Sequence, residues 1–401
     1  MRVLLSTYGS RGDVEPVAGL AVQLRELGVE VLMSAPPDDE FADLLAGVGV
    51  PLVPVGPSAR ELSKSAPPPT SIPERAAQII AAQTEAILPV AKDCDAMVVT
   101  GMMPAAAGAR SVAEKVGIPS VFAALQKVIL PSPHHTPLAY PGRPFPPEIT
   151  DNRQLWELDA ESINALFGDA LNTNRVTMDL PPVEHVRDYV FGDRPWLATD
   201  PTLDPWSGDL GVVQTGAWLL PDTRPLPPEL MAFLDAGTPP VFVGFGSMVM
   251  HSSPDAATTA IEAVRAQGRR VVVRAGWADL SLIDDQDDCF AVGEINQQAL
   301  FPRVAAVVHH GGSGTTTTAT RAGTPQVVVP QLADQPYFAG RVAELGVGVA
   351  HDGPTPTFES LSTALKSALT PETRARATAV AGQIRTNGTT IAAQLLVTNL
   401  A

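Results

Sequence analysis

Residues 305–340 constrain the fold of this chain most strongly, because they place a strand, a glycine-rich turn and a helix in direct succession. An apolar run over 305–308 is followed by a pair of histidines and then by three glycines within residues 311–314. A helical pattern comes next, a second apolar run covers 326–329, and Asp334-Gln335 opens a further helix. Strands that alternate with helices in this way form a parallel sheet. The backbone N–H groups at the start of the helix after the glycines can bind a phosphate.

The spacing of these glycines differs from the two common nucleotide-binding fingerprints. It fits neither G-x-G-x-x-G nor G-x-x-x-x-G-K-[ST]. The turn still predicts a phosphate site, because side chains in place of the glycines would hold the backbone away from the anion.

The same alternation of strands and helices occurs twice along the chain. The predicted strands are 3–7, 29–33, 52–55, 96–100 and 119–123 in the first half, and 241–245, 271–274, 290–292, 305–308 and 326–329 in the second. The fold class is therefore α/β, with two Rossmann-like domains whose parallel sheets face each other across a cleft. Residues 219–230 contain four prolines and are interpreted as a linker. We predict an N-terminal domain over 1–218, a C-terminal domain over 231–380 and a final helical segment over 381–401.

Composition and charge argue against several classes of function. A formal net charge of −16 opposes binding to a nucleic-acid backbone. The two cysteines, Cys94 and Cys289, are far apart and build neither a disulfide framework nor a metal cluster. No segment approaches the roughly 20 apolar residues of a membrane span, and the first apolar run is too short for a signal peptide. We expect a cytoplasmic protein without nucleic-acid or membrane partners.

Several motifs in a fixed order resemble the family 1 glycosyltransferases. Residues 310–315 and 330–335 match the nucleotide-sugar signature H-G-G-x-G-T followed by P-x-x-x-D-Q. Residues 9–13 read GSRGD, as in the bacterial antibiotic glycosyltransferases and especially those that act on vancomycin-type aglycones. The other matching motifs are TGMMPAAAGARSVAEKVGIP (100–119), FGDALN (167–172), LPPVEH (180–185), VQTGAWLLPD (213–222), VGFGS (243–247) and VAHDGPTP (349–356). The resemblance implies a GT-B fold, an acceptor-binding first domain, a donor-binding second domain and a last helix that crosses back to the first domain.

The resemblance also implies how the donor is bound. The co-substrate would be a UDP- or dTDP-sugar, and no metal or other cofactor would be needed. The diphosphate would lie against His310 and the glycine turn, while Asp334 and Gln335 would bind the sugar hydroxyls; by themselves, the latter two read as a helix cap. The donor-binding candidates are Arg11, Ser247, His310, Gly312, Ser313, Gly314, Thr315, Asp334 and Gln335. His309 is interpreted as a packing residue.

Asp13 is the candidate catalytic base. It follows the first strand, where an acceptor in the cleft could present its hydroxyl, and Ser10 would assist it or position the acceptor. A carboxylate with a pKa of about 3.9 is a weak base for an alcohol, so burial must raise its pKa or proton transfer must be late. The alternative interpretation is that Asp13 caps a helix that begins near Glu15-Pro16, and both roles are compatible.

Residues 131–147 interrupt the alternation with seven prolines. A long irregular segment inside a compact domain is usually functional. We interpret it as an acceptor-facing loop with His134, His135 and Tyr140 as acceptor-binding candidates, and a surface excursion without a binding role is the alternative.

These expectations combine into one hypothesis with two alternatives. The chain is expected to be a monomeric, inverting hexosyltransferase that transfers a sugar from UDP or dTDP to a hydroxyl of a glycopeptide antibiotic aglycone of the vancomycin or teicoplanin type. A macrolide or other polyketide aglycone is the alternative acceptor. A sugar-nucleotide epimerase on the same fold is the alternative from a different class of enzyme.

Overall fold

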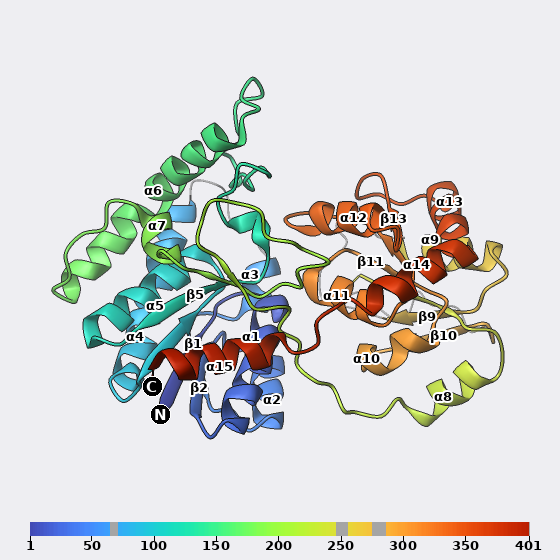
Figure 1. The fold of residues 1–401 in the computed structure, drawn as a ribbon, viewed down its shortest axis with the longest axis horizontal. Helices are drawn as coiled ribbons and strands as arrows, with labels where there is room; N and C mark the ends of the chain where they lie inside the picture. The colour runs from blue at the N-terminus through green and yellow to red at the C-terminus, as the bar shows by residue number, and fades with distance from the viewer. Residues whose placement is uncertain (65–70, 246–255, 275–285, 401) are drawn as a thin grey trace. The chain divides into compact units, whose positions relative to one another are not determined.

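The computed structural model describes residues 1–64, 71–245, 256–274 and 286–400. The chain divides into two compact units. Unit 1 comprises Met1–Pro201, Pro205–Leu220 and Arg385–Ala401, and unit 2 comprises Thr202–Asp204 and Pro221–Ile384. Each unit is built around one parallel sheet (Figure 1), which confirms the α/β prediction.

Unit 1 contains a seven-stranded parallel sheet in the order β3-β2-β1-β4-β5-β6-β7. Its strands are β1 (Arg2–Ser6), β2 (Glu30–Ala35), β3 (Leu52–Pro54), β4 (Ala96–Val99), β5 (Ser120–Ala124), β6 (Trp196–Leu197) and β7 (Val213–Gln214). Its helices are α1 (Arg11–Glu26), α2 (Asp39–Gly47), α3 (Ala59–Lys64), α4 (Ile72–Ala91), α5 (Met103–Val116), α6 (Asn152–Thr177), α7 (Val186–Phe191) and α15 (Gly388–Leu400). Figure 1 shows α15 beside α1, where Thr390 Oγ1 donates to Gln23 Oε1 at 2.6 Å.

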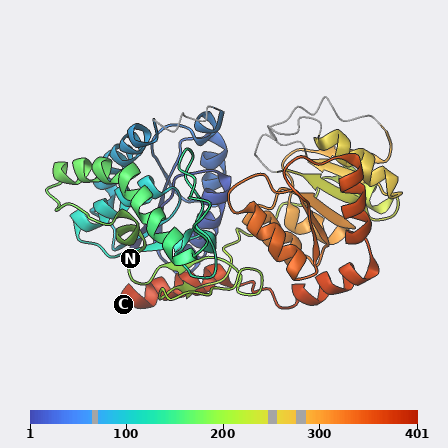
Figure 2. The ribbon, with the colours of Figure 1, turned by 90° about the horizontal axis from the view of Figure 1, so that it is seen from above.

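Unit 2 contains a six-stranded parallel sheet in the order β10-β9-β8-β11-β12-β13, the doubly wound arrangement. Its strands are β8 (Val241–Gly244), β9 (Val271–Arg274), β10 (Cys289–Val292), β11 (Ala306–His309), β12 (Gln326–Val328) and β13 (Gly348–Ala350). Its helices are α8 (Pro228–Asp235), α9 (Ala256–Ala266), α10 (Gln297–Leu300), α11 (Ser313–Arg321), α12 (Gln335–Glu344), α13 (Phe358–Ala368) and α14 (Pro371–Ala381). Figure 2 shows that helices cover both faces of the sheet in each unit.

Apolar cores on the two faces of each sheet hold these helices in place. In unit 1, one core packs α1, α2 and α15 against the sheet, and the other packs α4, α5 and α6. Strands β1 and β11 are buried along nearly their whole length, as central parallel strands require. No helix in the described ranges is long and apolar enough to cross a membrane.

The start of α1 differs from the prediction. The helix begins at Arg11 rather than near Glu15-Pro16, and Ser10 rather than Asp13 is its N-cap. The reason is a capping box in which Ser10 and Asp13, three residues apart, exchange hydrogen bonds between side chain and backbone. Pro16 therefore lies inside the helix.

Candidate active site

The GSRGD turn lies at the carboxyl end of β1, an interior strand of the sheet in unit 1 that pairs with β2 and β4. Asp13 Oδ2 accepts the Ser10 N–H at 2.7 Å and lies 3.3 Å from Ser10 Oγ, which in turn accepts the Gly12 N–H at 3.3 Å. Among the described residues, no group donates to Asp13 Oδ1. The capping interpretation of Asp13 is thus correct in part, and it accounts for only one of the two carboxylate oxygens.

Gly9 is required by the position of this carboxylate. A Cβ atom at residue 9 would lie 2.1 Å from Asp13 Oδ2 and 2.5 Å from Asp13 Cγ. A Cβ at Gly12 would meet nothing closer than Ser10 Oγ at 3.6 Å. Only the first glycine of the motif therefore makes room for the Asp13 side chain.

The surroundings of Asp13 raise the pKa of its carboxyl group above the ordinary value. Burial raises the pKa of Asp13 to about 6, while the hydrogen bonds from the Ser10 amide and hydroxyl act in the opposite direction. At neutral pH the group is still mostly ionised, and it is a stronger base than an ordinary carboxylate.

Arg11 points along the surface of α1. Its Nε donates to Glu15 Oε2 at 2.7 Å in an i,i+4 ion pair.

In unit 2, the glycine turn leads into the N-terminus of α11. Gly312 is the N-cap and supplies no side-chain cap, and the first amide of this turn with a backbone partner is that of Thr316. The amides of Ser313, Gly314 and Thr315 have no acceptor among the described residues. Their N–H groups and the helix dipole give this end of α11 the properties that suit an anion.

Threonines make up much of α11, although they are poor helix formers. Their hydroxyls donate to the carbonyl oxygens four residues earlier, from Thr316 to Gly312 (2.9 Å), Thr317 to Ser313 (2.8 Å) and Thr318 to Gly314 (2.8 Å). These bonds satisfy side chains that are largely buried and fix the first turn of the helix.

His309 is fully buried and forms a hydrogen bond with the backbone of the glycine turn. Its Nδ1 accepts the Gly311 N–H at 3.1 Å, so Nε2 carries the proton and donates to Gln326 Oε1 at 3.0 Å. Gln326 Nε2 continues the chain to Thr320 Oγ1 at 2.9 Å. Burial lowers the pKa of His309 to about 3, which keeps the ring neutral. The packing interpretation is confirmed, and His309 also holds the turn.

His310 faces the helix N-terminus. Its Nε2 lies 2.6 Å from where a Cβ of Gly312 would be, so the glycine makes room for the ring. Burial and the nearby positive charge of Arg274, the last residue of β9, lower the pKa of His310 to about 4. His310 Nδ1 is buried and has no partner among the described residues. Arg274 places a positive charge at this edge of the sheet. No motif in the sequence identifies this residue as part of the site.

The two parts of the nucleotide-sugar signature, residues 310–315 and 330–335, lie close together at Gly311. This residue has φ +94°, and a Cβ there would lie 2.7 Å from Val328 Cγ1 and 3.1 Å from the Gln335 carbonyl oxygen. Gln335 is buried, and its Oε1 accepts the Gln331 N–H at 2.8 Å. Asp334 is the N-cap of α12 but makes no capping hydrogen bond with its side chain. The simple capping interpretation of this pair is therefore wrong for the Asp334 carboxylate.

The proline-rich loop has no helix or strand between residues 131 and 151, as predicted. His134 is exposed. The His135 ring packs edge-on against Trp156 of α6 at 5.7 Å between centroids, and its Nε2 lies 3.0 Å from the Leu130 carbonyl oxygen. Tyr140 packs against Phe167 at 5.5 Å, and burial raises its pKa. His135 and Tyr140 thus anchor the loop on α6, and their contact with an acceptor stays a prediction.

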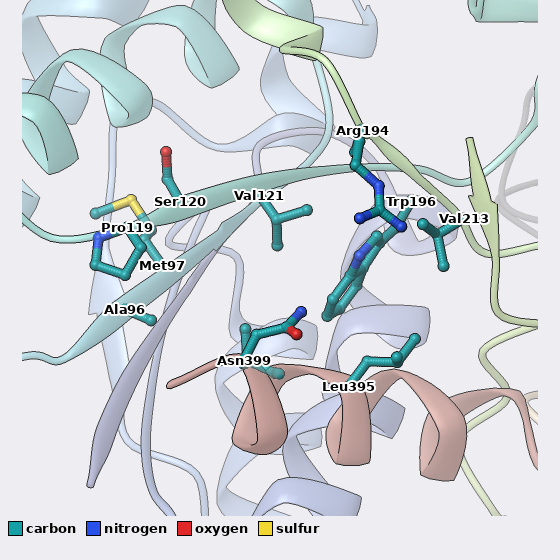
Figure 3. Close-up of a pocket in the computed structure, with 11 residues that line it drawn as sticks. Ala96, Met97, Pro119, Ser120, Val121, Arg194, Trp196, Val213, Leu395 and Asn399 are labelled. Atoms are coloured by element: carbon teal, nitrogen blue, oxygen red, sulfur yellow. The ribbon is translucent and has the colours of Figure 1, made fainter. Parts of the chain in front are cut away.

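A cavity of about 290 Å³ lies elsewhere in unit 1, between the amino-terminal ends of β4 to β7 and helix α15 (Figure 3). Trp196 and Arg194 line it from the sheet side, and Leu395 and Asn399 line it from α15. Since the GSRGD turn lies at the carboxyl end of the sheet, this cavity is remote from Asp13. Ser247, the remaining donor-binding candidate, lies outside the described residues. Within the described ranges, no cluster of three His, Cys, Asp or Glu side chains could hold a metal ion.

Two family models match the chain. Residues 3–129 match the glycosyltransferase family 28 N-terminal domain, and residues 269–393 match the erythromycin biosynthesis protein CIII-like C-terminal domain. The first contains the GSRGD turn and the second contains the glycine turn with α11 and α12.

Relatives of known name match over nearly their whole length. The chain is 57% identical to glycosyltransferase GtfE and 56% identical to vancomycin aglycone glucosyltransferase, both of Amycolatopsis orientalis, over 99% of this chain and 97% of each relative. Among solved structures, the glycosyltransferase of kitacinnamycin has a TM-score of 0.74 at 21% identity, covering 100% of this chain and 99% of that one. The glycosyltransferase VinC in complex with dTDP has a TM-score of 0.71 at 22% identity with the same coverage.

Proposed function

The chain belongs to the family 1 bacterial antibiotic glycosyltransferases of the GT-B fold, and on this premise we propose that it transfers a hexose from UDP or dTDP to a glycopeptide aglycone. The observation that carries the choice of acceptor is the 56% identity, over 99% of this chain, to vancomycin aglycone glucosyltransferase. The donor class is supported by the uncapped start of α11, which suits a diphosphate.

Asp13 is proposed as the base. The acceptor hydroxyl binds at Oδ1, and its proton passes to the carboxylate as its oxygen attacks the anomeric carbon. The bond between that carbon and the diphosphate oxygen breaks, and the diphosphate leaves with the electron pair. One such displacement inverts the anomeric configuration. A pKa of about 6 supports this role, because it strengthens the base and leaves it ionised at neutral pH.

The leaving diphosphate is stabilised in unit 2 by the amides of Ser313, Gly314 and Thr315 and by His310. His310 is neutral in the free protein and would donate a single N–H, or take up a proton once the anion is bound. Arg274 supplies positive charge beside it. Charge that develops on the departing oxygens thereby meets donors that are already in place, and no metal is required.

Asp334 and Gln335 are proposed to bind the sugar hydroxyls. The carboxylate of Asp334 is not used as a cap, and the contact of Gly311 with Gln335 holds the start of α12 beside the glycine turn. A carboxylate and an amide together accept and donate hydrogen bonds, which suits a pattern of hydroxyl groups.

The test is transfer itself. The protein is incubated with UDP-glucose or dTDP-glucose and a vancomycin-type aglycone, and products are identified by mass spectrometry, with Asp13→Asn as the matched variant. A hexose adduct from the wild type that falls by about 100-fold or more in the variant supports the proposal. An adduct only on a polyketide aglycone would change the acceptor. Conversion of the donor sugar without any acceptor would indicate an epimerase instead.

A further inference from the structure

A second cavity, of about 250 Å³, lies in unit 2 on the side of the sheet away from the donor-binding turn. Its walls include Ala305 and Pro325, which directly precede β11 and β12, so it opens at the amino-terminal edge of the sheet. The glycine turn follows β11 at the opposite edge. The cavity is smaller than the 300–1,000 Å³ typical of pockets for drug-sized ligands, which favours a small ion over a whole nucleotide sugar.

Two arginines line this cavity, Arg269 and Arg374, and no acidic residue does. Arg374 is fixed in place, because its guanidinium donates to the carbonyl oxygens of Gly323 (3.2 Å), Val304 (2.8 Å) and Ala305 (2.9 Å). Three of its five N–H donors are thereby used, and two remain. Burial and the positive charge of Arg269 lower the pKa of Arg374.

The two positive charges are uncompensated within the described part of the chain. No carboxylate there forms an ion pair with either Arg269 or Arg374, although acidic residues outnumber basic ones by 43 to 27 in this protein. Like charges that are held close together and partly desolvated repel each other. An anion between them would remove this cost.

The cavity also includes the start of α14, which spans Pro371–Ala381. Thr370 is the N-cap, and its Oγ1 accepts the Thr373 N–H at 3.3 Å. Thr370 and Pro371 both line the cavity, so the positive end of the helix dipole lies at its wall. Glu372 is on the first turn but is exposed and does not line the cavity.

We propose that this cavity is a second anion site, in which Arg269 and Arg374 bind a small polyvalent oxyanion of the phosphate or diphosphate class. The paired arginines supply most of the positive charge in this cavity, and the N-terminus of α14 adds to it. It is independent of the transfer reaction assigned to this enzyme. Bound anion stabilises unit 2 by relieving the repulsion between the two cations.

Thermal unfolding of the full chain tests this site. Each comparison is run with and without saturating UDP, which is included to occupy the donor-binding turn, and sodium pyrophosphate, phosphate or sulfate is compared with sodium chloride at equal ionic strength. At about a hundredfold excess over its Kd, pyrophosphate is expected to raise the Tm by about 5 °C or more. Arg269→Ala is expected to abolish this rise and to have a higher Tm than the wild type without anion. Arg269→Lys should retain part of the rise.

Lys92→Ala is the matched control, because Lys92 is an exposed cation of unit 1 and its loss changes the net charge by the same amount. It should retain the full response. The proposal is overturned if sodium chloride reproduces the effect, if the wild type does not respond, or if Arg269→Ala responds like the control. A response that disappears when UDP is present would assign the anion to the donor-binding turn and also refute the second site.

Discussion

Replacing Gly9 by alanine should damage catalysis while leaving the fold intact. The backbone at Gly9 does not have a positive φ, so alanine fits the local conformation. The new Cβ would, however, lie 2.1 Å from Asp13 Oδ2, whereas real Cβ contacts are essentially never shorter than 3.0 Å. The Asp13 carboxylate must therefore move by about 1 Å or rotate away from its position over the turn.

The size of the effect follows from that displacement. A misplacement of about 1 Å in a catalytic group costs about 100-fold in rate, which corresponds to about 2.7 kcal/mol of transition-state stabilisation. The assay is the steady-state rate of sugar transfer at saturating donor and acceptor. We expect kcat to fall by about 100-fold, with a much smaller change in the KM for the nucleotide sugar, because the donor contacts proposed in unit 2 are untouched.

Gly12→Ala is the control from the same turn. Its Cβ would meet nothing closer than 3.6 Å, and alanine is favoured over glycine inside a helix by about 1 kcal/mol. This variant should keep its activity and unfold at a slightly higher temperature. If Gly9→Ala retains a kcat within about threefold of the wild type, the position of Asp13 does not control the reaction, and the reasoning fails.

Three further results are expected. The folded-state pKa of Asp13, about 6, lies above its ordinary value of 3.8, so its stabilising contribution is present at low pH and is lost as the pH rises through about 6. Asp13→Asn should therefore have a higher Tm than the wild type above pH 7, and calorimetry should show the difference closing below about pH 4. A bound diphosphate should raise the pKa of His310 above about 4, so titration calorimetry should show UDP affinity increasing at lower pH in the wild type, and less so in His310→Gln. Gln326→Leu removes the acceptor of the buried His309 Nε2–H and should lower the free energy of unfolding by about 1–3 kcal/mol in urea.

The predicted strands in the described ranges are present, because buried parallel strands are short apolar runs that can be located directly in the sequence. Strands β6 and β7 contain only two residues each, and such short pairings leave no periodicity in the sequence. The start of α1 was within reach, since Ser10 and Asp13 have the spacing of a capping box, but Pro16 also suits a first turn and suggested a later start.

In the candidate site, too, some features could be predicted from the sequence and others could not. The glycines of both turns were identified by spacing, yet the reason for Gly9 is visible only once the Asp13 carboxylate is placed above it. The Gly311 N–H fixes the tautomer of His309, but the partner of its Nε2, Gln326, is 17 residues away in sequence. The position of Arg274 beside His310 depends on the strand order β9-β8-β11. Contacts between segments that are distant in sequence depend on the tertiary fold, so they cannot be predicted from the type of a single residue.

The most direct test of the central claim is the pH dependence of the single-turnover transfer rate in the wild type and in Asp13→Asn. The account predicts that the wild-type rate rises with pH, with a midpoint at about 6, and reaches a plateau near neutrality. It predicts that the variant is slower by about 100-fold or more and shows no such rise. A variant that transfers sugar at the wild-type rate, or that retains the same rise at about pH 6, would contradict the assignment of Asp13 as the base.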